Sequence, residues 1–266
     1  MQKRILQGSL IKEGKFNTLI VLDACRYDTF VEVAYELNIN GDLKCVDSEV
    51  LGTATWYFKN WMGFPGESEL IGIIANPWGM RYSLKFIETY KAWDETADAA
   101  KVDPDRTMEF YRKYAAGKKA MIHFIPPHQP FISPKGLDLY KKLGIDLSGM
   151  GGTNWDDRDN FKSLSHIQKW ISAYGRKGHW PEVKDAYKDN VRFILEKILR
   201  WMPEFLPPVV ITADHGEVVG EGGPNNTGGY GHCHSQPNVI KYQRLVPWLT
   251  FKKKDYVKER LKILGY

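Results

Sequence analysis

Short apolar runs separated by turn residues recur along the chain, and each has the length and β-branched content of a buried strand. The predicted strands are Thr18–Leu22, Leu70–Ala75, Ala120–Pro126, Pro208–Ala213 and Leu245–Phe251. Between them, apolar residues recur at the spacing of an amphipathic helix, which predicts helices over Thr29–Leu37, Pro104–Ala116 and Glu182–Trp201. Strands that alternate with helices predict an α/β fold, here a three-layer α/β/α sandwich around a mostly parallel central sheet.

One long segment departs from this pattern. Residues 132–180 have weak periodicity, and part of the segment is rich in Gly, Asp and Asn. We interpret residues 1–266 as a single domain in which this segment is either a surface excursion or a lid or specificity insert over the site.

Composition and charge narrow the class of function only a little. The formal net charge of +5 fits an anionic substrate, and no Lys/Arg-rich run indicates a nucleic-acid groove. The three cysteines have no paired spacing, which argues against a disulfide framework. No apolar stretch is long enough to span a bilayer. We therefore expect a cytoplasmic protein with no membrane span and no nucleic-acid partner.

Two predicted strands end directly in acidic residues. Asp23 follows residues 18–22, and Asp214 follows residues 208–213 with His215 beside it. The carboxyl ends of parallel strands meet at one edge of a sheet, so these side chains are expected to converge. Two carboxylates and an imidazole suit zinc, manganese or magnesium. One strand end alone would be as typical of a helix cap, so the prediction depends on both ends.

Three hydroxyl groups lie close to the start of a predicted helix. The segment SEVLGTATWYFKNW carries Ser48, Thr53 and Thr55 before a helix that begins near Trp56. A hydroxyl in this place is most often a helix cap. It also suits a nucleophile, because free N–H groups and the helix dipole stabilise an alkoxide and a bound phosphate. A divalent ion would lower the pKa of the hydroxyl further.

Histidines are concentrated in the same kind of position. Five of the seven lie in three short segments. Besides His215, the segment MIHFIPPHQPF carries His123 and His128, and a glycine-bounded loop carries His232 and His234. A lone histidine is usually structural, but this concentration favours metal ligands or phosphate contacts.

Taken in order, these segments resemble those of the alkaline phosphatase superfamily, particularly its small sulfatase-like branch. LIVLDACRYD is similar to the opening Asp strand, TADHGEVVGE to the paired Asp–His ligands, and PPHQPF to a His–Pro segment near the substrate. GYGH followed by QRLVPW resembles the last histidine loop and the strand after it. The matching segments extend from residue 18 to about residue 251, and DHGE at a strand end is the most specific of them.

The resemblance implies roles for particular residues. Asp23, Asp214 and His215 would bind one metal ion together with the oxygen of the nucleophile. Thr55 best matches that nucleophile, because it opens a helix a few dozen residues after the first Asp, with the other two hydroxyls as alternatives. Asn76 is placed like an asparagine that helps nucleotide pyrophosphatase/phosphodiesterase relatives to hold a phosphoryl oxygen.

A second metal site is implied less completely. His128 and His232 would bind a second ion or the transferred group. Full two-metal members carry an Asp four residues before the first of these histidines, where this chain has Phe124. Either one ion suffices, or His123 and His234 substitute or contact the substrate.

The predicted function is metal-dependent hydrolysis or transfer of a phosphate ester through a covalent phosphothreonine, with one or two zinc or manganese ions. The substrate would be a small-molecule, glycan-linked or lipid-linked phosphate or sulfate ester. A single ion would leave a second phosphate charge unneutralised, which favours diesters slightly. The alternatives are a sulfate or phosphonate ester hydrolase and a non-catalytic binding relative. Sulfatases proper use a cysteine followed by Pro and Arg, and CVDSE at Cys45 lacks both.

Overall fold

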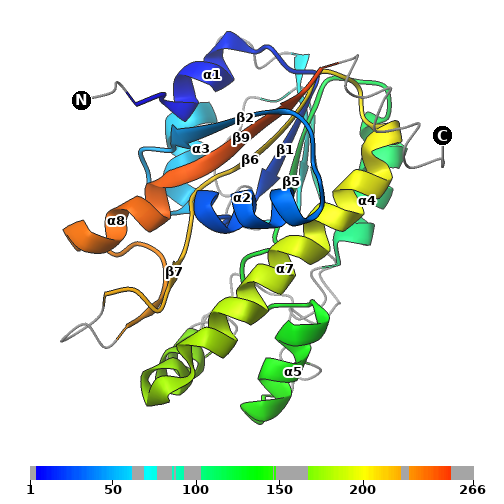
Figure 1. Ribbon diagram of the computed structural model, residues 1–266. Coiled ribbons are helices and arrows are strands. Elements are labelled where there is room, and N and C mark those ends of the chain that lie inside the picture. Colours follow the sequence, from blue (N-terminus) through cyan, green and yellow to red (C-terminus); the bar gives the residue numbers. More distant parts are fainter. Residues whose placement is uncertain are drawn as a thin grey trace.

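Seven strands form one central sheet in the computed structural model, which describes residues 4–61, 69–76, 86, 88–92, 103–145, 147, 167–222 and 228–252 (Figure 1). The strand order is β2-β9-β6-β1-β5-β3-β4. Five neighbouring strands from β6 to β4 are parallel, while β9 is antiparallel to both β6 and β2. The strands are β1 Thr18–Leu22, β2 Asp42–Asp47, β3 Ile71–Ile74, β4 Glu88–Lys91, β5 Ala120–Phe124, β6 Val209–Ala213 and β9 Leu245–Phe251, and a separate pair is formed by β7 Val218–Val219 and β8 Tyr230–Gly231.

The central strands are buried on both faces. Every residue of β1, β5 and β6 is buried, and nearly all of them are apolar. Continuous apolar runs of this kind are typical of parallel strands that have helices on both sides. β1 lies between β5 and β6, with Leu22 opposite Phe124 and Ala213, so the three strands end level with one another. The residues that follow them start from the same edge of the sheet.

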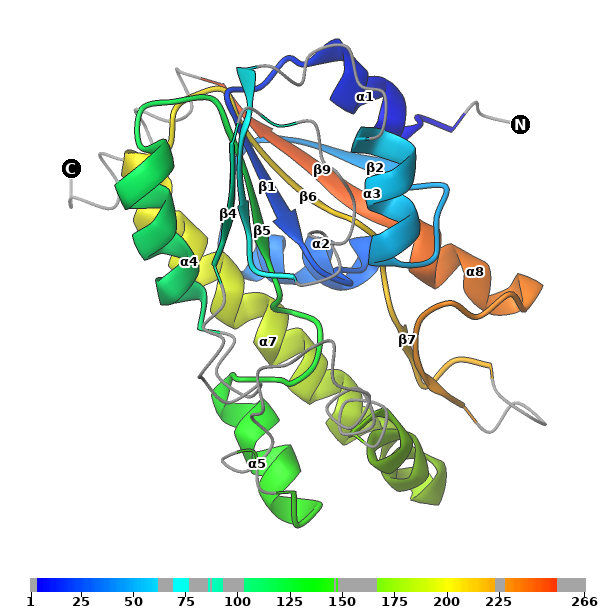
Figure 2. The same ribbon diagram turned by 180° about the vertical axis from the view of Figure 1, so that it is seen from behind.

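Helices cover both faces of the sheet, which confirms the predicted three-layer α/β/α sandwich (Figures 1 and 2). α2 and α7 pack together over one face, and α1 and α3 pack together over the other. None of the helices in the described part of the chain has both the length and the apolar composition needed to cross a bilayer. The α-helices with named bounds are α1 Gln7–Glu13, α2 Tyr27–Glu36, α3 Thr53–Trp61, α4 Pro104–Phe110, α5 Pro134–Lys142, α7 Trp180–Trp201 and α8 Pro237–Arg244. Residues 167–174 are also helical, a π-helix lies at Tyr111–Ala115, the segment Gly175–His179 is kinked at Gly178, and a 3-10 turn lies at Met202–Glu204.

The five strands expected from the sequence are all present, within two residues of the predicted bounds. The pattern missed β2 and β4, because both lie at edges of the sheet and neither is a continuous buried run. It also did not indicate that β9 is antiparallel. Strand direction depends on how the connecting chain returns to the sheet, and the composition of the strand does not report it.

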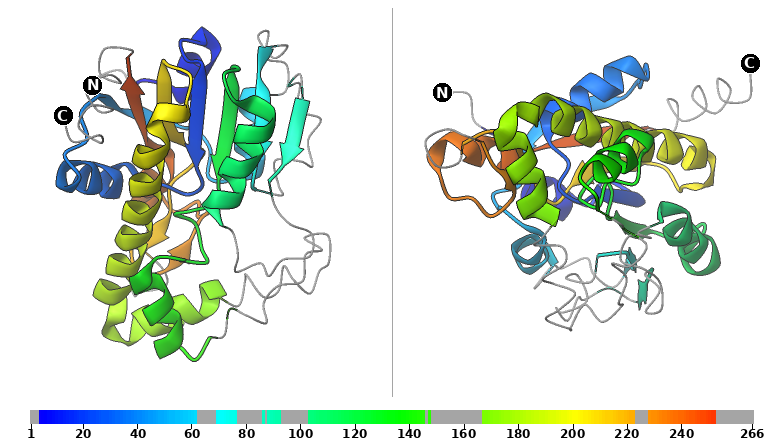
Figure 3. Two further views of the ribbon diagram at one scale, coloured as in Figure 1. Left: turned by 90° about the vertical axis from the view of Figure 1, so that its right-hand side faces the viewer. Right: turned by 90° about the horizontal axis from the view of Figure 1, so that it is seen from below.

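The unusual segment at residues 132–180 begins with helix α5. Ser133 caps this helix, with its hydroxyl accepting a hydrogen bond from the Gly136 N–H at 3.3 Å, and Pro134 follows at the first helical position. α5 packs along α7 (Figure 3). Residues 146 and 148–166 lie outside the described part of the chain, so the lid or specificity insert stays a prediction.

Candidate metal centre and active site

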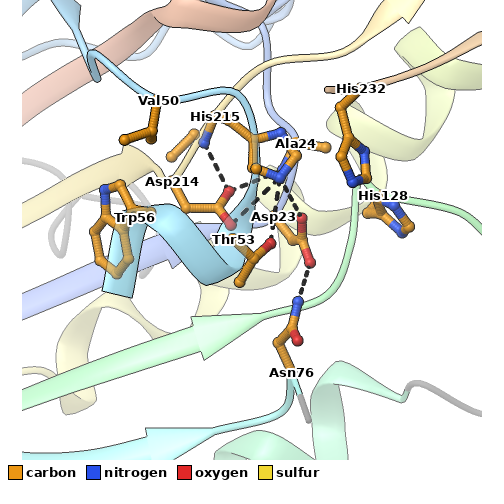
Figure 4. A network of polar contacts seen from close by, with 12 residues as sticks. Asp23, Ala24, Val50, Thr53, Trp56, Asn76, His128, Asp214, His215 and His232 are labelled. Carbon is orange, nitrogen blue, oxygen red and sulfur yellow. Dashed lines mark hydrogen bonds and ion pairs between the residues drawn. The ribbon is translucent and has the colours of Figure 1, made fainter. Parts of the chain in front are cut away.

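The acidic ends of β1 and β6 lie side by side, as the parallel sheet requires (Figure 4). Asp23 follows the last residue of β1, and Asp214 follows the last residue of β6. Asn76 and His128 follow β3 and β5 at the same edge. α3 begins at Thr53, whose side chain is directed at the two carboxylates. The sheet therefore gathers groups that are up to two hundred residues apart in the sequence.

Asp23, Asp214 and His215 form a first set of possible ligands, which we name the inner group. The His215 Nε2 atom lies 3.4 Å from Asp23 Oδ1 and 3.6 Å from Asp214 Oδ2. Thr53 Oγ1 lies 3.2 Å from the same nitrogen. A tetrahedral zinc ion about 2.0–2.1 Å from each ligand holds its ligand atoms about 3.3–3.4 Å apart. The three distances from His215 Nε2 are close to the spacing of ligand atoms around one tetrahedral ion.

Backbone and side-chain hydrogen bonds orient the inner group. His215 Nδ1–H donates to the Gly216 carbonyl at 2.8 Å, which leaves Nε2 unprotonated and free to bind a metal. Asp214 Oδ1 accepts from the backbone N–H groups of Ala24 at 3.1 Å and of His215 at 2.8 Å. The amide of Asn76 donates to Asp23 Oδ2. Each carboxylate is thus held by one oxygen, and the other oxygen is left for a ligand.

The remaining oxygens test whether a cation fits. Asp23 Oδ1 and Asp214 Oδ2 are buried and have no hydrogen-bond partner. Removing an ionised carboxylate from water costs several kcal/mol unless a counter-charge compensates. Both oxygens belong to one group whose ligand atoms lie within 4.8 Å of one another. A divalent cation satisfies both oxygens at once, so the inner group fits the metal that the sequence predicted.

His128, Glu217 and His232 form a second set, which we name the outer group. His232 Nδ1 lies 3.4 Å from Glu217 Oε1, and His128 Nε2 lies 4.0 Å from Glu217 Oε2. Neither carboxylate oxygen of Glu217 has a hydrogen-bond partner, although the residue is fully buried. The His215 and His232 ring centres are 4.5 Å apart, so the outer group adjoins the inner one (Figure 4). One carboxylate and two imidazoles again suit a divalent ion.

Burial and charge shift the pKa values of these groups in different directions. Burial, followed by repulsion from Asp214, raises the pKa of Asp23 well above its usual range. Burial lowers the pKa of His215 to about 3, so that its ring is neutral at physiological pH. Burial opposes protonation of His232 as well, but the Glu217 carboxylate outweighs it and raises the pKa of His232. Without metal, protons partly take the place of the cation.

We expect metal binding to release protons and metal affinity to rise with pH. A metal binds only deprotonated Asp23 and neutral His232, whose pKa values are both raised. Below the raised pKa of His232, which lies above its ordinary 6.5, zinc affinity should fall about tenfold for each unit by which the pH is lowered, for each proton released. Titration calorimetry in buffers of different ionisation enthalpy measures the proton count, and a count of zero at pH 6.5 would contradict this expectation.

The structure brings Thr53 to the inner group, but it does not bring Thr55 there. The Thr55 hydroxyl donates to the Gly52 carbonyl at 2.7 Å, which closes the first turn of its own helix. The Ser48 hydroxyl donates to the Val50 carbonyl at 3.3 Å. Of the three hydroxyls predicted as candidate nucleophiles, only that of Thr53 contacts a ligand of the inner group.

A buried polar network fixes α3 against the strand that carries Asp214. Trp56 Nε1 donates to Gln7 Oε1 at 2.8 Å. Gln7 in turn donates to Thr212 Oγ1 at 2.8 Å and to the Ala213 carbonyl at 2.6 Å. Gln7, Trp56 and Thr212 are fully buried, so this network keeps the first turn of α3 in register with the end of β6.

Two of the predicted histidines are not members of either group. His123 is fully buried within β5, and its Nδ1 atom lies 2.6 Å from the Tyr57 hydroxyl, so it cannot reach a substrate in solution. His234 lies in the loop before α8, where its backbone N–H donates to Gln243 Oε1 at 2.8 Å. Neither supplies the missing ligand of the second site, which the sequence had offered as one alternative.

Glu217 is the site residue that sequence reasoning missed. Its position three residues after Asp214 was compatible with an acid that orients His215 or with one exposed to solvent, but the chain turns back at Gly216 and buries it. A β-carbon at Gly216 would lie 2.1 Å from the Tyr242 carbonyl oxygen, so only glycine allows this path. The sequence signal for its burial was its place directly before the apolar pair Val218–Val219. A buried acid needs a cation or a hydrogen-bond donor beside it, which would have indicated a role in the site.

Comparisons with known proteins found likeness in solved structures alone. A search against protein-family models and a search of curated proteins gave no match. The chain is similar to the C-terminal periplasmic domain of EcEptC from Escherichia coli in complex with Zn (TM-score 0.46, 11% identity, 92% of this chain and 75% of that one). It is also similar to the C-terminal periplasmic domain of phosphoethanolamine transferase EptC from Campylobacter jejuni (TM-score 0.48, 14% identity, 98% and 82%). A third similar structure is BT4656 in complex with its substrate D-glucosamine-2-N,6-O-disulfate (TM-score 0.37, 14% identity, 93% and 66%).

These matches correct one expectation. The sequence led us to expect a cytoplasmic protein, and that expectation is wrong, because the EptC structures similar to this chain are periplasmic domains. The expectation had rested on the absence of an apolar stretch long enough to span a bilayer, and such an absence does not report a compartment. Identities of 11–14% describe a likeness in fold, so the proposal below rests on the side chains of the site.

Proposed function

We propose that this protein is a metal-dependent enzyme of the alkaline phosphatase superfamily that transfers or hydrolyses phosphate esters through a covalent intermediate on Thr53. The observation that carries the proposal is the distance of 3.2 Å between Thr53 Oγ1 and His215 Nε2, beside two buried carboxylate oxygens that have no hydrogen-bond partner. A capping hydroxyl has no reason to face two buried carboxylates, whereas a nucleophile that needs activation does.

The chain's own residues would do most of the chemistry. Thr53 Oγ1, after losing its proton, would attack phosphorus in line with the leaving oxygen, forming an O–P bond as the ester O–P bond breaks, and the leaving oxygen would take up a proton and depart as the alcohol. The inner group would hold a divalent ion, which when bound lowers the pKa of a coordinated hydroxyl and neutralises developing charge. Water or an acceptor alcohol would then displace phosphorus from Thr53 and restore the hydroxyl.

The outer group marks the side from which a substrate would approach. The side chains of His128 and His232 are 14% and 23% exposed, while those of Asp23, Asp214 and His215 are at most 3% exposed. His128 Nδ1–H donates to the Gln129 carbonyl at 2.7 Å, so its Nε2 atom is available to a second ion or to a phosphoryl oxygen. Groups at this position stabilise charge on the equatorial oxygens of the transition state.

Charge balance favours a singly charged substrate group. Asp23, Asp214 and Glu217 carry three negative charges and an ionised Thr53 would carry a fourth, so two divalent ions would leave the site neutral before a substrate binds. A phosphodiester monoanion would then bring in one negative charge and a phosphomonoester dianion two, so diesters are favoured although Glu217 now completes a second ligand set. A sulfate monoester carries the same charge and is the second candidate. Cys45, in β2 opposite Pro247, is not in either ligand group, which favours phosphate over sulfatase-type chemistry.

A substrate panel tests the proposal. We expect the zinc- or manganese-loaded protein to turn over an aryl phosphodiester faster than an aryl phosphomonoester or an aryl sulfate. Treatment with a chelator should abolish turnover, and added metal should restore it. An added alcohol as acceptor separates transfer from hydrolysis by its product. Turnover that persists after complete metal removal would contradict the proposed function.

A further inference from the structure

A buried tyrosine–histidine pair adjoins the inner group. His123 lies in β5 near the centre of the sheet, and Tyr57 lies in α3, the helix that begins with Thr53; both side chains are fully buried. The Tyr57 hydroxyl oxygen lies 2.6 Å from His123 Nδ1. On the other side of the ring, His123 Nε2 lies 3.8 Å from Asp214 Oδ2 and has no hydrogen-bond partner. The ring therefore connects α3 to a ligand carboxylate.

The contact with Tyr57 determines which ring nitrogen of His123 carries the proton. If the Tyr57 O–H donates to Nδ1, the proton of the neutral ring sits on Nε2 and faces the carboxylate. The opposite arrangement would place a nitrogen lone pair against an Asp214 oxygen, which is repulsive. Burial raises the pKa of Tyr57 well above its ordinary value, which keeps its O–H as a donor, and lowers the pKa of His123 to about 4.

The two carboxylate oxygens of Asp214 have different surroundings. Its Oδ1 atom is held by two backbone N–H groups, but its Oδ2 atom, the one turned to the inner group, accepts no hydrogen bond. His123 Nε2 is within ion-pair range of this oxygen. At 3.8 Å the separation is longer than a hydrogen bond, so the ring acts on Asp214 by electrostatic attraction.

We propose that Tyr57 and His123 are positioning residues that hold Asp214 Oδ2 toward the metal, with Tyr57 fixing the ring and His123 Nε2–H directed at the carboxylate. This inference rests on the proposed function, since it takes Asp214 as a metal ligand. Outer partners of metal ligands typically account for 10–100-fold in metal affinity. His123 would thus support the metal site, although its full burial prevents it from contacting the substrate.

Zinc affinity, measured by chelator competition, tests the pair independently of turnover. We expect Tyr57→Phe to weaken zinc binding at the inner group about 10–100-fold. His123→Leu, which removes the ring donor, should weaken binding at least as much. His123→Gln, whose amide N–H can occupy the place of Nε2–H, should retain most of the affinity. Tyr111→Phe is the matched control, because it removes a hydroxyl of a buried tyrosine that donates to the Glu204 carbonyl at 3.1 Å, away from either group.

The outcomes separate this inference from the proposed function. Thermal unfolding of the metal-free variants identifies any that fail to fold, and Tyr57→Phe removes only one oxygen. Zinc affinity unchanged in folded Tyr57→Phe and His123→Leu would overturn the inference and leave the proposed function intact. Equal loss in His123→Gln and His123→Leu, with none in Tyr57→Phe, would also overturn it, because the ring would then be a ligand. A wild-type protein that binds no zinc would contradict the proposed function itself.

Discussion

Replacing Thr53 by alanine is expected to lower turnover of an aryl phosphodiester by at least about 10⁴-fold, because it removes the attacking oxygen. The inner group would keep its three protein ligands, so zinc should still bind to the Thr53→Ala protein. Thr53→Ser keeps a hydroxyl at the same position and should retain measurable activity. Steady-state kinetics together with metal analysis of each purified variant would measure both effects.

Thr55→Ala is the matched control for this experiment. Its hydroxyl closes the first turn of α3 on the Gly52 carbonyl, so its loss should cost about 1 kcal/mol of stability and little turnover. Mass spectrometry of a quenched reaction should place the phosphoryl group on Thr53, with fragmentation distinguishing it from Thr55. An inactive Thr55→Ala beside an active Thr53→Ala would assign the nucleophile to Thr55 and reject the arrangement proposed above.

The second large effect is expected at the outer group. Glu217→Gln should reduce bound zinc from two ions to one, because a neutral amide replaces the only carboxylate of that group. We expect turnover to fall about 100-fold, the range found when one charge-stabilising group is removed from an active site. Metal stoichiometry by elemental analysis and turnover of the same sample test the two parts together.

A control at an exposed ion pair separates the effect of losing a charge from the effect of losing a ligand. Glu204→Gln removes a carboxylate that binds Arg112 at 2.7 Å outside both ligand groups, and it should leave stoichiometry and turnover unchanged. Without metal, Glu217→Gln should lose stability at pH values where His232 is protonated, because the neutral amide no longer attracts that ring. Two ions bound per Glu217→Gln molecule would show that the outer group does not need this carboxylate.

Much of the fold was predictable because the residue types of the central strands indicate directly that these strands are buried. β1, β5 and β6 are continuous apolar runs, and a run of that kind has few stable places other than the middle of a parallel sheet. The edge strands β2 and β4 were missed, because half-exposed strands have no such signature. The lid or specificity insert between residues 132 and 180 stays a prediction, because part of this segment lies outside the described residues.

The sequence by itself determined the inner group, since Asp23, Asp214 and His215 end buried strands and parallel strands end at a common edge. Only the tertiary structure decided which hydroxyl joins them. Side chains two residues apart on a helix point in directions that differ by about 200°. Because Thr53 lies on the side of α3 that faces the inner group, Thr55 points away from that group. The rotation of α3 about its own axis depends on contacts between distant parts of the chain, which local sequence patterns do not record.

Packing between distant segments also determined the surroundings of Glu217 and His123. The sequence did not indicate that Glu217 is buried beside the site, and the Tyr242 carbonyl that packs against the preceding Gly216 belongs to a distant segment. His123 was read correctly as part of a buried strand, yet its neighbours Tyr57 and Asp214 come from another helix and another strand. Local sequence encodes which side chains are buried, whereas the partners they meet inside are set by packing.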